Sequence, residues 1–369
     1  MGGNGDYRRL RILHIDPEKN WGGGEAQVLG LLGYLAARGH QNDLLGNPHG
    51  LLLTRCRTLD VRAQSMIMRN DADVRCVPAL RRLIRERNYD IVHFHTKRAH
   101  ALALWVPRSH PRPKYVVTRR MDYPEHPSWY TRFLYNRRVD GVVAISRAIG
   151  DQLANAGVHQ EKIRCISSGI DPGIFSQVSG SHAGAADVFV VGCLASLEER
   201  KGHQYLLEAA ALLKAQGLKI RYELAGEGPR RAQLEAEVTR LGLCEQVRFL
   251  GFINDTAKFF AEVDLLAMPS LYEGLGVAAL EAMAAGRAVI ATRVGGLTES
   301  VIDGATGLLV PPRDSAALAR AIAKFAESRS LAQRMGSCGR ERVRRYFSLE
   351  TMAKQNESYY QELVGCSPD

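Results

Sequence analysis

Residues 269–281 read PSLYEGLGVAALE, and this segment decides the fold class. The apolar run before it, at 265–268, is typical of a short buried strand, and residues 277–284 form a helical pattern after the glycine-rich turn. A strand that passes through a tight turn directly into a helix is the repeating unit of a parallel α/β sheet. The segment therefore predicts an α/β domain with this turn at the carboxyl end of a strand.

The same segment carries two glutamates, Glu273 in the turn and Glu281 in the helix. The turn exposes the backbone N–H groups of Gly274, Leu275 and Gly276, which suit an anionic ligand in front of a helix. Glu281 comes about one helical turn further on, among apolar residues, where a carboxylate is costly to bury unless it accepts hydrogen bonds. We therefore expect Glu281 to reach back to a polyol such as ribose.

Short apolar runs alternate with helical patterns along the chain, which predicts βαβ units and mainly parallel sheets. The expected strands are 11–15, 61–67, 91–95, 115–118, 142–145, 188–193, 221–225, 247–250, 265–268 and 288–291. The expected helices are 26–37, 78–87, 147–156, 203–216, 230–241, 277–284, 315–326, 331–345 and 349–364. A stretch at 171–187, rich in Gly, Ser, Pro and Ala, interrupts the pattern and indicates a linker.

The length of 369 residues fits two domains. We expect two doubly wound, Rossmann-like α/β domains that face a central cleft, because open α/β sheets bind ligands at the carboxyl ends of their strands. The first would cover 1–172 and bind the acceptor, and the second would cover 187–345 and bind a nucleotide sugar. The last residues, 346–369, would form a helix that packs back toward the first domain.

Composition excludes several classes of protein. No apolar run approaches the roughly 20 residues that span a bilayer, and the first residues lack the basic and apolar parts of a secretory signal. The seven cysteines are scattered and include no C-x-x-C pair, so neither a disulfide framework nor a zinc site is expected. No nucleic-acid-binding motif is present. We expect a cytoplasmic protein that needs no metal or cofactor and binds no nucleic acid.

The net charge of +10 is concentrated in the first half. Residues 1–171 carry 27 Lys and Arg against 16 Asp and Glu, and residues 172–369 carry 22 against 23. A basic face would suit an anionic acceptor or peripheral attachment to the anionic inner face of a membrane. Solvated arginine-rich helices, as at 81–87, explain the excess equally well. The charge leaves both interpretations open.

Two further loops suit a phosphate. Gly22, Gly23 and Gly24 come between the first strand and a helix, where backbone N–H groups can approach an anion closely. A merely tight turn is the alternative for these glycines. Arg200 and Lys201 also lie between a strand and a helix, where a cation would neutralise a diphosphate leaving group.

The motifs taken together resemble one family, the retaining glycosyltransferases of family 4, which have the GT-B fold. The resemblance spans nearly the whole chain, and the motifs of the second half are the most specific. They are GGGE at 22–25, RGH at 38–40, GEGP at 226–229, Glu273 and Glu281 with E-x7-E spacing, GRAVIAT at 286–292, GGLTE at 295–299 and DGATGLLV at 303–310.

The resemblance implies a role for each matching residue. Glu273 would contact hydroxyl groups of the donor sugar, Glu281 would hold the ribose, and Lys201 would bind the diphosphate and support catalysis. The implied donor-binding residues are Gly23, Gly24, Arg200, Lys201, Gly226, Glu273, Gly274, Leu275, Gly276 and Glu281. The enzyme would mainly stabilise the charge of the leaving group, without a metal ion.

Two departures from the family pattern concern the site. Aligned on Lys201, Ser196 stands where the family often has an arginine, which leaves more of the diphosphate to Lys201 and puts the role of Arg200 in doubt. Where many members have a histidine, this chain has RRMD at 119–122. Arg119 and Arg120 become candidates for binding a phosphorylated or acidic acceptor, and Asp122 for helping to deprotonate an acceptor hydroxyl. A structural Arg–Asp pair is the alternative.

Two histidines lie on one expected strand. His95, at its carboxyl end, is a candidate catalytic and acceptor-binding residue, and His93 is expected to be a hydrogen-bonded core residue. We place their side chains on opposite faces of the sheet, where they would not share a metal ion.

The resemblance implies transfer of a hexose-type sugar from a nucleotide-diphosphate sugar, with retention of configuration, to a glycan or lipid-linked acceptor. Synthesis of cell-envelope polysaccharide or lipopolysaccharide is the expected context. A GT-B nucleotide-sugar epimerase is the alternative, but the E-x7-E pattern with Lys-Gly favours transfer. The missing signal sequence disfavours a periplasmic type of two-domain binding protein.

Overall fold

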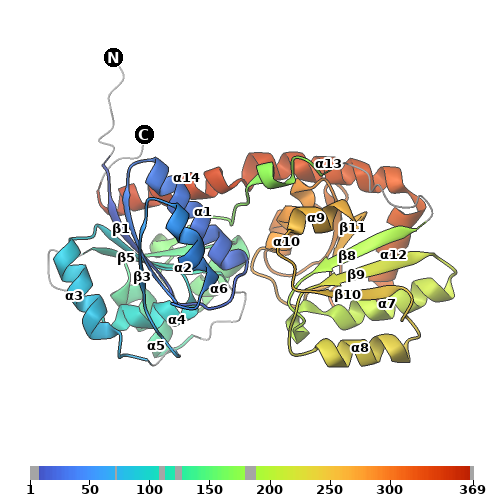
Figure 1. The fold of residues 1–369 in the computed structure, drawn as a ribbon, viewed down its shortest axis with the longest axis horizontal. Coiled ribbons are helices and arrows are strands. Elements are labelled where there is room, and N and C mark those ends of the chain that lie inside the picture. Colours follow the sequence, from blue (N-terminus) through green and yellow to red (C-terminus); the bar gives the residue numbers. More distant parts are fainter. Residues whose placement is uncertain (1–7, 71–72, 108–112, 121–126, 179–187, 366–369) are drawn as a thin grey trace, which may run out of the picture. The chain divides into compact units, whose positions relative to one another are not determined.

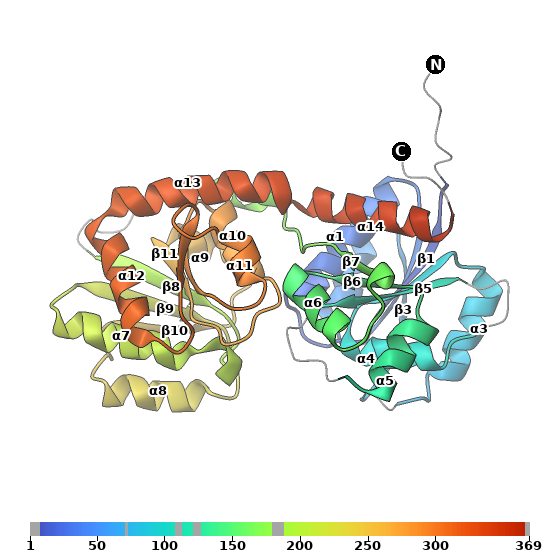
Figure 2. The same ribbon diagram turned by 180° about the vertical axis from the view of Figure 1, so that it is seen from behind.

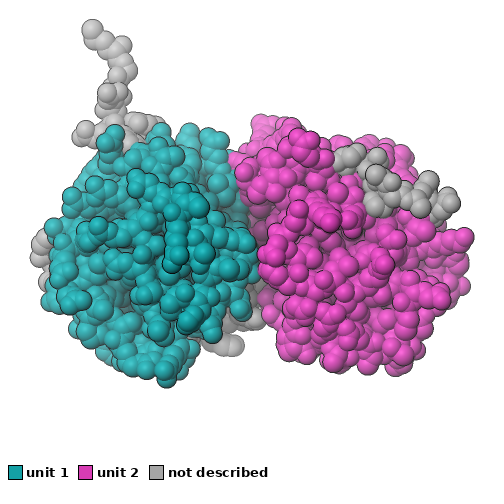
Figure 3. All heavy atoms as spheres, viewed as in Figure 1, with its two compact units in different colours: residues 1–169, 349–369 teal, residues 170–348 magenta. Residues whose placement is uncertain are grey.

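The computed structural model describes residues 8–70, 73–107, 113–120, 127–178 and 188–365. The chain forms two compact units, one of residues 1–169 with 349–369 and one of residues 170–348 (Figure 3). Each unit is built on one parallel sheet. Within the described ranges, no helix is both long enough and apolar enough to cross a membrane.

The first unit contains a sheet with the strand order β3-β2-β1-β4-β5-β6-β7, and all neighbouring strands are parallel (Figures 1 and 2). The strands are β1 (Arg11–Asp16), β2 (Gln41–Gly46), β3 (Arg62–Ser65), β4 (Ile91–Phe94), β5 (Lys114–Arg119), β6 (Gly141–Ala144) and β7 (Ile163–Cys165). The chain moves outward from β1 to β3 and resumes on the other side of β1 with β4. The topological switch point, where such sheets bind ligands, therefore lies between β1 and β4.

Two helices from opposite ends of the chain cover one face of this sheet. In both views α14 runs along α1, and their apolar side chains pack with Ile12, Ile91 and Val116 in one core. The helices are α1 (Gly23–Ala37), α2 (Leu51–Arg55), α3 (Val77–Arg87), α4 (Lys97–His100), α5 (Trp129–Arg132), α6 (Arg147–Asn155) and α14 (Leu349–Leu363), with short 3₁₀ segments at Cys56–Thr58, Ala101–Leu104 and Gln160–Lys162 and a π-helical segment at Phe133–Arg138. The last helix thus belongs to the first unit.

The second unit has the strand order β10-β9-β8-β11-β12-β13, again with all neighbours parallel. The strands are β8 (Phe189–Leu194), β9 (Ile220–Ala225), β10 (Val247–Gly251), β11 (Leu265–Met268), β12 (Ala288–Thr292) and β13 (Gly307–Val310). Here the strand order reverses between β8 and β11. The loops that follow these two strands are therefore placed to build a ligand site.

Helices cover both faces of the second sheet (Figure 1). Apolar side chains of α7, α8 and α12 pack on one face, and α9 and α10 lie against the other, where Gly192 leaves space for Phe259. The helices are α7 (His203–Ala215), α8 (Arg231–Arg240), α9 (Thr256–Ala261), α10 (Val277–Ala284), α11 (Leu297–Ser300), α12 (Ser315–Glu327) and α13 (Arg329–Tyr346), with 3₁₀ segments at Pro172–Phe175 and Glu199–Lys201.

The alternating pattern predicted from the sequence is confirmed, although three strands and the short helices α2, α4, α5, α9 and α11 were not predicted. The three strands are β2, β7 and β13. The helix expected from residue 26 begins earlier, at Gly23, so Gly23 and Gly24 lie in the first turn of α1 and not in the loop before it. Residues 179–187, most of the expected linker, lie outside the described part of the chain.

Candidate functional site

The loops after β8 and β11 meet at the switch point of the second sheet. The backbone N–H of Leu271 donates to the carbonyl of Arg200 at 2.7 Å, which ties the two loops together. Next to this bond, Lys201 Nζ contacts Glu273 Oε2, and both side chains are almost buried, at 11% and 12% exposed. From the sequence, Lys201 and Glu273 were expected to be separate contacts of one ligand, and the structure brings them into direct contact with each other.

The turn after β11 leaves several amide groups available. Gly276 has φ 82° and ψ 65°, a left-handed conformation that favours glycine, and a Cβ there would lie 2.5 Å from Leu297 Cδ2. The N–H groups of Gly274, Leu275 and Gly276 donate no hydrogen bond to any described residue. Because they precede α10, the partial positive charge of the helix N-terminus adds to that of the amides. This turn can therefore accept an anion.

Glu281 lies in α10, one turn beyond these amides. Burial raises the pKa of its carboxyl group to about 7, and a hydrogen bond with the Thr256 side chain of α9 opposes the shift. A buried carboxylate gains stability from further hydrogen-bond donors, and two ribose hydroxyl groups are donors of that kind. The geometry is thus compatible with the role that the resemblance implied.

The remaining donor-side candidates lie at the same edge of the sheet. Arg200 Nε donates to Glu198 Oε2 at 2.7 Å, so its guanidinium is engaged by a neighbour. Gly226 follows β9 and has a φ of 139°. A Cβ at this position would lie 2.0 Å from the carbonyl oxygen of Ala195. Only glycine therefore lets the loop after β9 approach the loop after β8 this closely. The Gly226 amide donates to the carbonyl of Gly251 at 2.8 Å.

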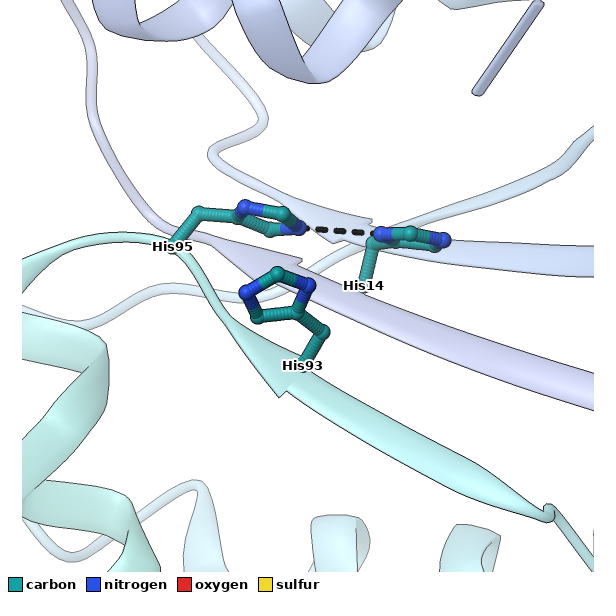
Figure 4. A group of neighbouring side chains, drawn as sticks. All are labelled: His14, His93 and His95. Carbon is teal, nitrogen blue, oxygen red and sulfur yellow. Dashed lines mark hydrogen bonds between the residues drawn. The ribbon is translucent and has the colours of Figure 1, made fainter. Parts of the chain in front are cut away.

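In the first unit, polar side chains gather on one face of the sheet at its carboxyl edge. His93 and His95 lie on the same side, with ring centroids 3.9 Å apart, and His14 Nδ1 lies 2.9 Å from His95 Nε2 (Figure 4). The prediction that His93 and His95 point to opposite faces is therefore wrong. Residues two apart on a strand share a face, because side chains alternate from one residue to the next.

The prediction of His93 as a hydrogen-bonded core residue is confirmed. Its Nδ1 lies 2.5 Å from the Tyr360 hydroxyl of α14, and its Nε2 lies 2.6 Å from Thr118 Oγ1 of β5. Burial lowers the pKa of His14 to about 3 and holds the pKa values of His93 and His95 well below the ordinary value. All three rings are therefore neutral at physiological pH.

The three histidines could in principle hold a metal ion, since one ring nitrogen from each lies within 4.8 Å of the others. Two observations count against that use. Both nitrogens of His93 are engaged by hydroxyl groups, and the Arg120 guanidinium is close enough to lower the pKa values of His93 and His95 further. A fixed positive charge nearby opposes a divalent cation. The contacts fit a hydrogen-bonded polar cluster better than a metal centre.

Arg120 lies beside this cluster, with two acidic side chains near it. Burial, and to a smaller extent the Glu25 carboxylate, raises the pKa of Asp16 to about 7, while the charge of Arg120 opposes the shift. Burial also raises the pKa of Glu25, and Arg120 again acts in the opposite direction. A substituted Cβ on Gly24 would lie 3.5 Å from Arg120 Cδ, so the first turn of α1 passes directly over the arginine.

Arg119 and Arg120, which were predicted to act as a pair, point to different sides of β5. Arg119 is buried near His100, and Arg120 lies near His93 and His95. Adjacent residues at the end of a strand face opposite ways, so the two guanidinium groups do not form one anion clamp. Asp122, the candidate for deprotonation, lies outside the described residues. His95 is 1% exposed and lies directly after β4.

Several polar residues of the first-unit cluster were not singled out from the sequence. Asp16 directly follows the predicted strand 11–15 and ends β1, on the edge where ligands bind, and this position alone could have drawn attention to it. Ser168 follows β7, a strand of three residues that was not predicted, so no signal pointed to it. Tyr360 comes from α14, and its contact with His93 depends on tertiary packing between ends of the chain.

The chain is an α/β protein of two units, each built on one parallel sheet, and comparisons with known proteins identify its family. The family model of glycosyl transferases group 1 matches residues 179–342, and that of glycosyltransferase family 4 matches residues 21–173. The lipopolysaccharide core biosynthesis glycosyltransferase LpsE of Rhizobium meliloti (strain 1021) is 34% identical over 269 residues, 71% of this chain and 75% of that protein. This chain therefore belongs to the family 4 glycosyltransferases, and it is a glycosyltransferase.

Further similar proteins agree with this assignment. The lipopolysaccharide core biosynthesis mannosyltransferase LpcC of Rhizobium leguminosarum bv. viciae is 30% identical over 246 residues, 64% of this chain and 68% of that protein. Among solved structures, Anabaena Alr3699/HepE in complex with UDP matches with a TM-score of 0.83 and 25% identity, over 96% of this chain and 100% of that one. A glycosyltransferase from Rickettsia africae ESF-5 has a TM-score of 0.84 at 21% identity, over 97% and 100% of the two chains. The fold is GT-B.

Proposed function

We propose that this chain transfers a hexose-type sugar from a nucleotide-diphosphate sugar, with retention of configuration, to a glycan or lipid-linked acceptor. The observation that carries the proposal is the contact of Lys201 with Glu273 beside the unpaired amides of Gly274 to Gly276. An ammonium group and a helix N-terminus at one turn suit a diphosphate. The adjacent carboxylate suits sugar hydroxyl groups, which donate hydrogen bonds. Anabaena Alr3699/HepE, of the same fold, was solved with UDP and glucose.

The reaction breaks the bond between the anomeric carbon and the β-phosphate oxygen and forms a bond from that carbon to the acceptor oxygen. The acceptor proton passes to the departing diphosphate on the same face of the sugar, which retains the configuration. Lys201 and the amides before α10 stabilise the charge that grows on the diphosphate as the bond breaks. We propose that this stabilisation replaces a divalent metal ion.

Relatives and surface residues support an acceptor from the cell envelope. LpsE and LpcC are named for lipopolysaccharide core biosynthesis. In the first unit Trp129 is 76% exposed and Tyr130 45% exposed, and the exposed Arg132 follows them on α5. Exposed aromatic and cationic side chains together suit an anionic lipid surface. We propose that the first unit contacts such a surface to reach a lipid-linked acceptor.

Binding and product analysis test the proposal. Purified protein is titrated with a panel of nucleotide sugars and the melting temperature is followed, since a ligand that binds the folded state raises it. The stabilising donor is then incubated with candidate envelope glycans, and the product linkage is determined by NMR. An α-linked product from an α-linked donor supports a retaining transferase. A free epimerised nucleotide sugar, or an inverted linkage, would overturn the proposal.

A further inference from the structure

The turn between β11 and α10, residues 270–276, leaves its amide groups free while its carbonyl groups are held. We name it the amide turn. The N–H groups of Gly274, Leu275 and Gly276 donate to no described residue. The carbonyl groups of the same peptide units lie against the segment 296–300, which consists of the glycine before α11 and of α11 itself. This segment overlaps the motif GGLTE at 295–299, to which the donor site assigned no role.

Two of these carbonyl groups accept hydrogen bonds. The backbone N–H of Gly296 donates to the carbonyl oxygen of Glu273 at 3.1 Å. Ser300 Oγ donates to the carbonyl oxygen of Leu275 at 3.0 Å, and Ser300 is completely buried, so water does not compete for its proton. A serine in a helix commonly bonds to the preceding helical turn, but the carbonyl oxygens of Gly296 and Leu297 lie further away, at 3.3 Å. The hydroxyl of Ser300 is therefore directed to the amide turn.

The third carbonyl group, that of Gly274, is confined by contact. Gly296 has a φ of −70°, which any residue can adopt, yet a Cβ there would lie 2.1 Å from the carbonyl oxygen of Gly274. The close approach, and not the backbone conformation, therefore requires glycine at position 296. The Gly274 carbonyl group lies directly against the backbone of Gly296.

A held carbonyl group also fixes the direction of an amide group. In a trans peptide unit the C=O and the N–H of the next residue lie in one plane and point in opposite directions. The three held carbonyl groups share their peptide units with the N–H groups of Gly274, Leu275 and Gly276. Because these carbonyl groups point toward the segment 296–300, the three N–H groups point away from it.

The base of the amide turn is anchored as well. Thr292 Oγ1, which is buried at the end of β12, donates to the carbonyl oxygen of Ser270 at 2.5 Å. In the same peptide unit, the N–H of Leu271 donates to the carbonyl oxygen of Arg200 at 2.7 Å. Both ends of this peptide unit are engaged, so the amide turn is held at its base beside the loop of Lys201.

We propose that Ser300 and Gly296 are positioning residues, which aim the three amides of the amide turn at the diphosphate of the donor. Ser300 acts through the Leu275 carbonyl group and does not touch the ligand itself. Amides that already point outward do not have to reorganise when the ligand binds, so more of the free energy of their hydrogen bonds contributes to affinity. This inference rests on the proposed function, which makes a diphosphate the ligand of these amides.

Substitution of Ser300 tests the positioning role. The wild type is titrated calorimetrically with UDP, GDP and ADP, and the diphosphate that binds most tightly is used for the variants. Ser300→Ala should bind it about tenfold more weakly, the factor expected for the loss of one hydrogen bond. Ser300→Thr keeps the hydroxyl group and should bind like the wild type, even where the added methyl group lowers the melting temperature.

Thr306→Val is the control for a general loss of stability. Thr306 is buried in the same unit, and its Oγ1 accepts from the backbone N–H of Ile302 at 2.9 Å. It comes directly before β13, at the amino ends of the parallel strands and therefore opposite the amide turn. Thr306→Val should lower the melting temperature and leave the affinity unchanged. Equal loss of affinity in Ser300→Ala and Thr306→Val would show that binding follows stability and would overturn the positioning role.

The remaining outcomes separate this inference from the proposed function. Wild-type affinity in Ser300→Ala, or equally weak binding by Ser300→Ala and Ser300→Thr, would overturn the positioning role and leave the proposed function intact. Gly296→Ala, whose Cβ would displace the Gly274 carbonyl group, should also weaken binding, and it keeps the test valid if Ser300→Ala fails to fold. A wild type that binds none of the three diphosphates would overturn the proposed function and this inference together.

Discussion

Lys201 Nζ contacts Glu273 Oε2 at the point where the strand order of the second sheet reverses. In the free protein each charge neutralises the other, and both side chains are almost buried. A diphosphate can take over the ammonium group, and sugar hydroxyl groups can take over the carboxylate. The pair therefore keeps the site charge-balanced before the donor binds.

Replacing Lys201 by alanine should weaken binding of the cognate nucleotide sugar by about 10- to 100-fold, the range expected for losing one charge-assisted hydrogen bond. Isothermal titration measures the effect. Lys324→Ala, at an exposed lysine of α12 in the same unit, is the control and should bind like the wild type. Equal donor affinity in Lys201→Ala and Lys324→Ala would remove Lys201 from the site.

Glu281 should make the stability of the protein depend on pH. Burial raises the pKa of its carboxyl group from 4.5 to about 7, so between these values the folded state keeps a proton that the unfolded state has lost. The free energy of unfolding then falls as pH rises through this window. Glu281→Gln avoids the penalty and should be more stable than the wild type by about 2 kcal/mol at about pH 8, with no gain at about pH 4.

Urea denaturation across this pH range measures the difference. Glu327→Gln, at the exposed end of α12, should change stability equally little at every pH. A constant difference between Glu281→Gln and the wild type would mean that Glu281 titrates normally.

The ionisation of Glu281 should also change the affinity for the donor. This affinity should rise with pH, whereas the free energy of unfolding falls. Ribose hydroxyl groups donate to the ionised form, so affinity for an intact nucleotide sugar should rise between about pH 6 and about pH 8. An intact nucleotide sugar is the suitable probe because its diphosphate does not titrate in this range. Glu281→Gln should bind more weakly and show a flat profile. A pH-dependent rise that persists in Glu281→Gln would assign the effect to another group.

The fold was largely predictable because its strands are short apolar runs, whereas its helices are longer segments with a helical spacing of apolar residues. The exceptions have physical reasons. β2 begins with Gln41, Asn42 and Asp43, which do not resemble a buried strand, and β7 is a three-residue edge strand with exposed residues. Both are held in place by parallel pairing with neighbours that are distant in sequence, which local patterns do not encode.

The polar sites of the two units differed in how far the sequence could predict them. Lys201 and Glu273 each follow a predicted strand, so strand ends alone place them at one edge of the sheet. The polar cluster of the first unit depends on which face each side chain takes, and there the prediction for His93 and His95 was wrong. The sequence also did not show that Arg119 and Arg120 lie near different histidines, His100 for Arg119 and His93 and His95 for Arg120.

With an identified donor and acceptor, the glycosyl transfer activity should persist in excess EDTA. The diphosphate charge is met by Lys201 and by the amides before α10, and both ring nitrogens of His93, in the first unit's histidine cluster, are engaged by hydroxyl groups. Initial rates with EDTA, and with added Mg²⁺ or Mn²⁺, measure the requirement. Loss of activity that one of these ions restores would show that charge stabilisation by the protein alone is not sufficient.

The first unit should bind anionic vesicles through α5 and release them in salt. Exposed arginines attract anionic headgroups, and this attraction weakens as ions screen it. Trp129, which stacks on Phe133 with ring centroids 5.2 Å apart, adds an aromatic ring of interfacial type. Co-sedimentation with phosphatidylglycerol vesicles should decrease with added salt and decrease further in Trp129→Ala. Tyr346→Ala, at an exposed aromatic of the second unit, should bind like the wild type. Binding that salt does not reduce, or that Trp129→Ala leaves intact, would show that α5 does not mediate attachment.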